Sequence, residues 1–190
     1  MVWKKSGAKK EYTEHTLYEY AVGALGRRMR TVAELKRLMR TRAGNQPDCE
    51  AMVEAVTTRL KQQRYLNDTN YAASYSTNRR DSDKFGKMRV VQDLRAKGVH
   101  PDVIEKTVGE TYGEIDEQTL AQQFVERKRL KPPADQKSAA RIFRMMARAG
   151  FSSPVIVKLL RNWKVEDNTL SALEQEREMA ESSPLPEDES

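Results

Sequence analysis

The 190-residue sequence predicts an all-α protein built from three tandem three-helix repeats. From residue 16 to about residue 163, apolar side chains recur every three or four residues, as in an amphipathic helix, and no segment alternates as a strand does. Two turns also resemble each other: Gly98 and Gly150, 52 residues apart, each end a basic segment and precede a proline and a Val-Ile pair. Helical periods near 50 residues are typical of short arrays, in which each unit buries its apolar face partly against a neighbour.

The first repeat is predicted to contain helices at 16–29, 32–42 and 48–63. Thr31 and Glu34 stand at the spacing of a capping box, in which the threonine side chain and the glutamate side chain each satisfy a free backbone amide. The box therefore indicates where the second helix begins.

The second repeat is predicted at 68–80, 84–97 and 101–112. Gly98 ends the middle helix at a position where a left-handed residue is favourable. Pro101 suits the first turn of the next helix, where its missing amide hydrogen is not needed.

The third repeat is predicted at 117–130, 135–149 and 154–163. A Pro132-Pro133 pair separates its first two helices, and Gly150 and Pro154 separate the last two. The predicted organisation is a basic flexible arm at 1–14, three repeats at 15–66, 67–115 and 116–164, and an acidic disordered tail at 165–190.

Charge is distributed unevenly along a chain whose formal net charge is +6. Residues 174–190 hold seven acidic side chains and one basic one, whereas residues 1–173 hold 33 basic and 21 acidic ones. A basic body indicates a polyanion or an acidic protein surface as partner. The acidic tail either competes for that body or only aids solubility.

Residue types that carry catalysis or bind metals are scarce. One cysteine, Cys49, excludes an internal disulfide and a multi-thiolate zinc site, and His15 and His100 are the only histidines. The sequence contains no Walker-type glycine loop, no G-x-G-x-x-G and no H-E-x-x-H motif. No apolar run approaches a membrane span of about 20 residues, and the lysine-rich N-terminus lacks the apolar core of a secretory signal. We therefore expect a cytoplasmic monomer that is not an enzyme and has no cofactor or metal.

Basic side chains recur on the middle helix of each repeat, and one face at a 100° rotation per residue is expected to carry them. A solvated face would look the same in any one helix, so recurrence in all three is what favours a binding function. The candidate partner-binding residues are Lys36, Arg37, Arg40, Lys84, Lys87, Arg89, Arg95, Lys97, Arg141, Arg144 and Arg148.

Segments of the second repeat closely resemble the RecX family of bacterial RecA regulators. They are Arg64-Tyr-Leu-Asn-Asp68, Tyr71-Ala72, Gly86-Lys-Met-Arg-Val90 and Leu94-Arg-Ala-Lys-Gly-Val99. The first repeat adds Arg30-Thr-Val-Ala-Glu-Leu35, with Thr where the family has Ser, and the third adds Arg148-Ala-Gly-Phe151, with Ala149 inserted into the family's R-G-F step. The resemblance spans about residues 16–163 and leaves the arm and the tail outside it.

The resemblance implies three three-helix units in an elongated, curved array. It also implies a regulator, mainly an inhibitor, that binds the groove of the RecA–DNA filament across adjacent protomers, with single- or double-stranded DNA as a further partner. Such binding would suppress ATP hydrolysis, strand exchange and filament growth. The resemblance also implies a role in homologous recombination, DNA repair and the SOS response. Two alternatives stay open: a helical DNA-binding module, and a basic adaptor for another acidic protein.

Overall fold

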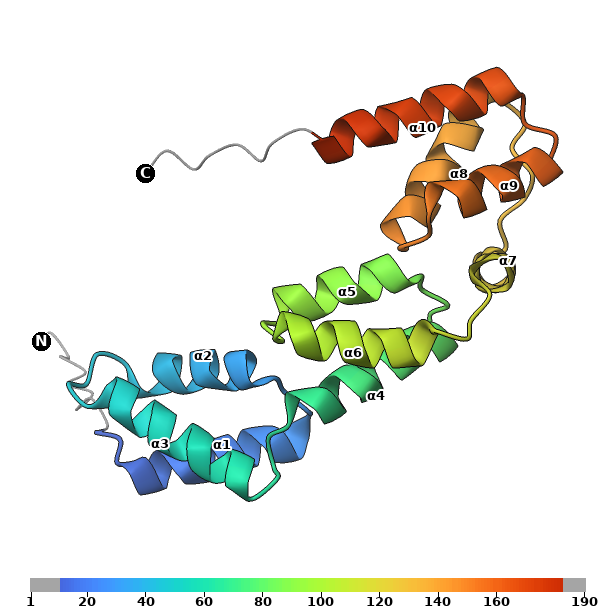
Figure 1. Ribbon diagram of the computed structural model, residues 1–190. Coiled ribbons are helices and arrows are strands. Elements are labelled where there is room, and N and C mark those ends of the chain that lie inside the picture. The colour runs from blue at the N-terminus through green and yellow to red at the C-terminus, as the bar shows by residue number, and fades with distance from the viewer. Residues whose placement is uncertain (1–10, 183–190) are drawn as a thin grey trace, which may run out of the picture. The chain divides into compact units, whose positions relative to one another are not determined.

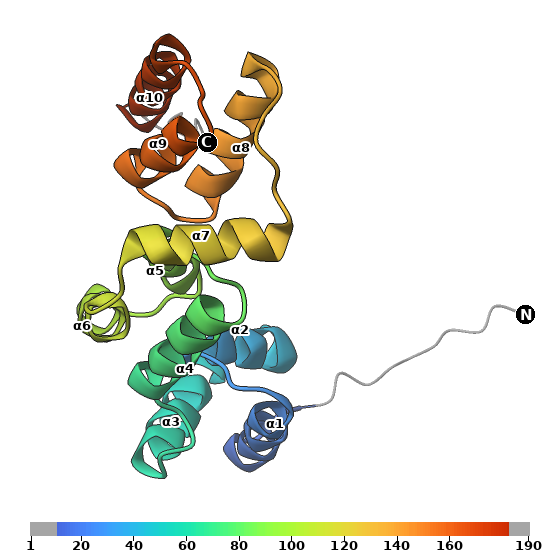
Figure 2. The same cartoon turned by 90° about the vertical axis from the view of Figure 1, so that its right-hand side faces the viewer.

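The computed structural model describes residues 11–182, and the described chain folds as ten helices without a strand (Figures 1 and 2). The prediction of an all-α fold is therefore confirmed, and nine of the helices correspond to the nine predicted ones. Their bounds are α1 Glu14–Arg27, α2 Val32–Ala43, α3 Cys49–Gln62, α4 Asp68–Asp81, α5 Lys87–Ala96, α6 Pro101–Tyr112, α7 Glu117–Lys128, α8 Gln136–Arg148, α9 Ser153–Asn162 and α10 Asp167–Ser182.

The helices group into two compact units. Among the described residues, 11–74 and 94–107 form the first unit, and 75–93 and 108–182 form the second. The boundaries run through α4, α5 and α6, so both units share the helices of the predicted second repeat. The boundaries of the three repeats stay a prediction.

Both predicted ends differ from what the structure shows. Thr13 caps α1 in a capping box with Thr16, so helical structure begins inside the predicted arm; residues 1–10 lie outside the described residues. The prediction that the chain is disordered from residue 165 is wrong for residues 167–182, because these residues form α10. The reason is a short apolar stripe: Leu170 and Leu173 are 1% and 7% exposed and bury the helix against its neighbours. Residues 183–190 lie outside the described residues.

In the first unit, the first turn of α2 packs on the glycine turn that ends α5. The Thr31 hydroxyl accepts a hydrogen bond from the Glu34 amide at 3.0 Å, which confirms the capping box, and donates one to the Lys97 carbonyl at 2.7 Å. Gly98 has φ +73°, and a Cβ built there would lie 2.5 Å from the Ala33 Cβ. Only glycine therefore permits both this turn and this approach.

Thr31 should be sensitive to loss of its hydroxyl. The residue is fully buried, and alanine would remove the cap and leave the Lys97 carbonyl without this donor. We expect Thr31→Ala to destabilise the first unit by about 1–2 kcal/mol. Thr31→Ser keeps the hydroxyl and should lose much less in chemical denaturation, whereas equal losses would show that the methyl group dominates.

The second unit contains the equivalent contact one repeat later. The Gly86 amide donates to the Ala149 carbonyl at 2.8 Å, so the start of α5 packs on the turn between α8 and α9. A Cβ at Gly86 would lie 2.5 Å from the Gly150 carbonyl carbon, and a Cβ at Gly150, where φ is +92°, would lie 2.6 Å from that of Arg89. The 52-residue resemblance thus marks two equivalent glycine contacts, one in each unit.

Aromatic side chains form the core around this contact. The Phe124 ring lies 5.4 Å from Phe151 and 6.4 Å from Phe85, measured between centroids. The Tyr112 hydroxyl donates to the Phe85 carbonyl at 2.9 Å. The core fixes α8 with its apolar side chains inward, so its polar side faces solvent.

Candidate partner-binding surface

The basic stripe of α2 is largely neutralised by acidic side chains of α3. Lys36 pairs with Glu54, and the Arg40 guanidinium makes two bonds to Glu50, of 2.9 and 2.6 Å. The hydrogen bonds to Glu50 raise the pKa of Arg40, and the same bonds lower the pKa of Glu50. Of the three predicted cations on this helix, Arg37 alone is exposed without an ion pair to another described residue.

The stripe predicted for residues 84–97 does not form as one helical face. Lys84 lies in the turn before α5, with φ +58°, because α5 begins only at Lys87, after the Gly86 contact. Lys87 and Arg95 are exposed. The prediction that Lys84, Lys87 and Arg95 share one face of a helix is therefore wrong.

Two further predicted cations of this segment are already paired with acidic side chains of the same chain. The Arg89 Nε lies 3.0 Å from the Asp93 carboxylate, which also accepts a bond of 2.9 Å from the Tyr75 hydroxyl. Lys97 Nζ lies 3.1 Å from Glu34. Burial is the largest single effect on the pKa of Lys97 and lowers it, but the hydrogen bonds and charge interactions with Glu34 and Tyr71 together outweigh burial, so the pKa is raised and the charge retained.

The third stripe lies on α8 as a continuous exposed face. Ala139, Ile142, Phe143 and Met146 are buried, whereas Arg141, Arg144 and Arg148 are exposed on the same helix. Asp135 caps the helix and accepts a hydrogen bond from the Ser138 amide at 2.7 Å. Arg144 is 3.2 Å from Glu176 of α10, while Arg141 and Arg148 make no ion pair with a described residue. The helix therefore presents arginine side chains that a partner can reach.

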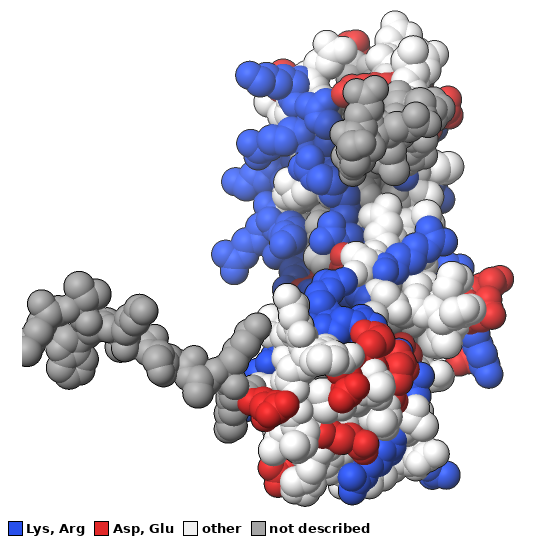
Figure 3. All heavy atoms as spheres, turned by 90° about the vertical axis from the view of Figure 1, so that its left-hand side faces the viewer, with Lys and Arg blue, Asp and Glu red and all other residues white. Residues whose placement is uncertain are grey.

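Sequence reasoning missed five more exposed cations between residues 127 and 137 of the second unit. A plain count would have found them, since four of the five residues from 127 to 131 are basic and Lys137 precedes Arg141 by one helical turn. Arg127 pairs with Asp83 at 3.2 Å, and Lys128 lies 5.8 Å from the Phe124 ring. Lysine and arginine side chains gather over this unit in the upper part of Figure 3. The missed residues are Arg127, Lys128, Arg129, Lys131 and Lys137.

We call the exposed cations of α8 the α8 surface, which consists of Lys137, Arg141, Arg144 and Arg148. The start of α5 packs against the end of α8, because the Gly86 amide donates to the Ala149 carbonyl. Arginine can bind carboxylate or phosphate through two parallel hydrogen bonds. The α8 surface therefore suits an anionic partner.

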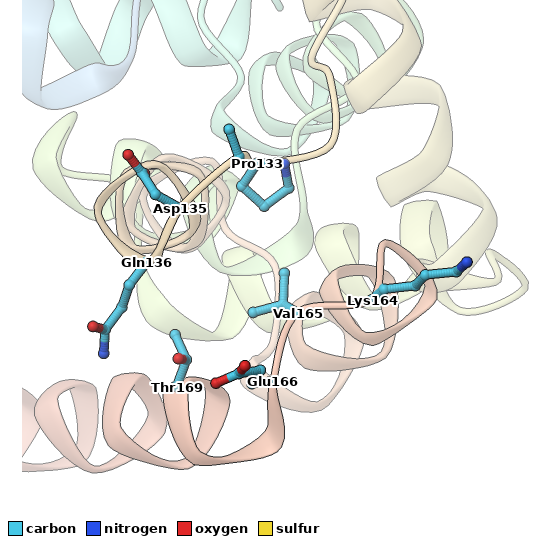
Figure 4. Close-up of a pocket in the computed structure, with 8 residues that line it drawn as sticks. Pro133, Asp135, Gln136, Lys164, Val165, Glu166 and Thr169 are labelled. Carbon is cyan, nitrogen blue, oxygen red and sulfur yellow. The ribbon is translucent and has the colours of Figure 1, made fainter.

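A hollow in the same unit lacks such a cluster of cations (Figure 4). It has a volume of about 290 Å³ and lies between the loop before α8 and the loop before α10. Asp135, Lys164 and Glu166 line it with mostly small or polar neighbours, and Asp135 is already engaged in capping α8. Within residues 11–182 no three His, Cys, Asp or Glu side chains are grouped as a metal site requires, and no helix is long and apolar enough to cross a membrane.

The fold and the α8 surface together define the class of protein: a helical-repeat protein that presents an arginine-rich face. Residues 67–108 match the family model described as the second three-helix domain of RecX. The regulatory protein RecX of Leptothrix cholodnii is 32% identical over 141 residues, which cover 74% of this chain and 85% of that protein. The chain therefore belongs to the RecX family, and the resemblance seen in the sequence is confirmed.

A further relative agrees with this assignment, and two solved structures share the fold. The regulatory protein RecX of Deinococcus radiodurans is 31% identical over 153 residues, or 80% of this chain and 70% of that protein. A crystal structure of regulatory protein RecX matches 78% of this chain and 71% of its own, with a TM-score of 0.63 and 22% identity. The crystal structure of RecX from Lactobacillus salivarius matches 80% of this chain and 96% of its own, with a TM-score of 0.59 and 20% identity. The two structures share the fold.

Proposed function

We propose that this protein regulates a RecA recombinase, mainly as an inhibitor, by binding the RecA–DNA filament. Relatives that are named regulatory protein RecX support this role. The observation that carries the proposal is the α8 surface, where Arg141 and Arg148 are exposed and make no ion pair with a described residue. Inhibition by binding requires no catalytic residue in this chain.

The repeat architecture suits a filament as partner. A filament presents the same protomer surface again and again along its axis, and a chain of similar helical units can contact several copies at once. Once one unit is bound, the others meet their sites at a high effective concentration, so weak contacts add up. We place the chain in the filament groove, across adjacent protomers.

Such binding would slow the filament without any chemistry of its own. ATP turnover and strand exchange require neighbouring protomers to change their relative geometry. A ligand that binds one geometry better than the other shifts the population towards it. Bridging two protomers would therefore suppress ATP hydrolysis, strand exchange and filament growth.

Electrostatics favours the DNA phosphates as the target of the α8 surface. The cations of residues 127–148 outnumber the one acidic side chain of that segment, Asp135, which caps its own helix. Such a cluster is the electrostatic footprint of nucleic-acid binding. A helical DNA-binding module that has no effect on RecA is accordingly the second candidate function.

The decisive measurement is the ATPase activity of RecA on single-stranded DNA with this protein added at substoichiometric amounts. We expect the activity to fall, because one bound molecule would restrain several protomers. An excess of single-stranded DNA serves as the control, since a protein that merely sequesters DNA would lose its effect there. Unchanged ATPase activity together with tight DNA binding would favour the second candidate function instead.

A further inference from the structure

An acidic helix lies against the arginine face of α8. Helix α10 contains Asp167, Glu174, Glu176, Glu178 and Glu181, against a single basic residue, Arg177. The carboxylate of Glu176 lies 3.2 Å from the Arg144 guanidinium, and both side chains are at least half exposed. One arginine of the proposed binding surface is therefore already occupied by an anion from the same chain.

Among its described residues, the buried side chains of α10 lie in its first half. Leu170 and Leu173 are buried, and the Arg161 guanidinium lies 3.0 Å from Asp167 at the helix start. Beyond them, the described side chains up to Met179 are exposed or half-buried, and Met179 itself is 72% exposed. No buried side chain holds the described part of α10 that carries Glu176, and a competing anion can replace Glu176 as the partner of Arg144.

A groove separates this part of α10 from α8. It has a volume of about 240 Å³, a floor formed by Phe143, Ala147 and Leu173, and a rim that includes Arg144 and Arg148. Arg177 also lines it and donates to the Phe151 carbonyl at 3.1 Å. Because the helices are not tightly packed here, Arg144 can turn from Glu176 to another anion without opening the core.

We infer that α10 is a built-in competitor for the DNA phosphates that bind α8, with Glu176 holding Arg144 until DNA displaces it. The inference rests on the proposed binding role of the α8 surface and adds its regulation. Exposed ion pairs are weak and are screened by salt. The competition therefore lowers DNA affinity modestly, and most at low ionic strength.

The test measures binding of a fluorescein-labelled single-stranded oligothymidylate to the full-length chain by fluorescence anisotropy. Glu176→Gln should bind about two- to fivefold more tightly than the unmodified protein at low salt, the range expected for one exposed ion pair. Glu174→Gln is the matched control, because it removes the same charge from the same helix and Glu174 makes no ion pair with a described residue. The gain of Glu176→Gln over this control should shrink as salt rises.

A double-mutant cycle shows whether Glu176 acts through Arg144. In an Arg144→Gln background, Glu176→Gln and Glu174→Gln should have equal effects, because the paired arginine is gone. Equal affinities of the two glutamine variants in the unmodified background would overturn the competitor role. Failure of the proposed binding surface looks different, because DNA affinity would then survive the loss of Arg141, Arg144 and Arg148 together.

Discussion

Replacing Gly86 by alanine is expected to destabilise the second unit by about 3 kcal/mol, the upper part of the usual range for overpacking a close contact. The added Cβ would lie 2.5 Å from the Gly150 carbonyl carbon and 2.9 Å from the Phe151 amide nitrogen. Both neighbours are backbone atoms, so no side chain can rotate away to relieve the overlap. The start of α5 and the turn after α8 would have to separate, which disturbs the core around Phe151.

Thermal unfolding followed by circular dichroism measures this effect, and the midpoint should fall by roughly 10 °C. Gly109→Ala is the control, since a Cβ there meets nothing within 4 Å and the residue lies inside α6. That substitution should stabilise the unit by about 0.5–1 kcal/mol, because alanine loses less conformational freedom in a helix than glycine does. A Gly86→Ala variant as stable as the unmodified protein would contradict the close contact.

Replacing Arg141, Arg144 and Arg148 together by glutamine is expected to weaken binding to single-stranded DNA by at least about tenfold near 0.1 M salt. Each phosphate contact to a single strand contributes about 0.7 to the steepness with which log affinity falls against log salt concentration. Loss of three contacts should therefore reduce that steepness by about 2. Inhibition of RecA should weaken in parallel. All three side chains are exposed, so helicity should not change.

The matched control removes the same number of charges from the first unit: Lys36, Arg37 and Arg40 replaced by glutamine. Lys36 and Arg40 are paired with Glu54 and Glu50, so a partner would have to displace those carboxylates first. This variant should therefore lose much less affinity than the α8 variant. Equal losses would show that net charge, rather than the α8 surface, governs binding.

The positions of nine helices and of the repeated glycine turns could be predicted from the sequence alone. Helix periodicity, the Thr31 capping box and the prolines that open helices are local signals that act within about one turn. The family resemblance was also readable, because its motifs are short and contiguous. Among the described helices, α10 was missed. It has only two buried leucines, and the acidic residues that follow them made the segment look like a disordered tail.

Whether a cation is accessible to a partner was decided only by the tertiary structure. Lys36, Arg40 and Lys97 follow the same exposed periodicity as Arg141 and Arg148, yet carboxylates 18, 10 and 63 residues away pair with them. The close approach of Gly86 to Gly150 likewise joins residues that are distant in the chain. Charge and periodicity are properties of a single segment, whereas an ion pair or a close contact depends on which second segment the fold brings within a few ångströms.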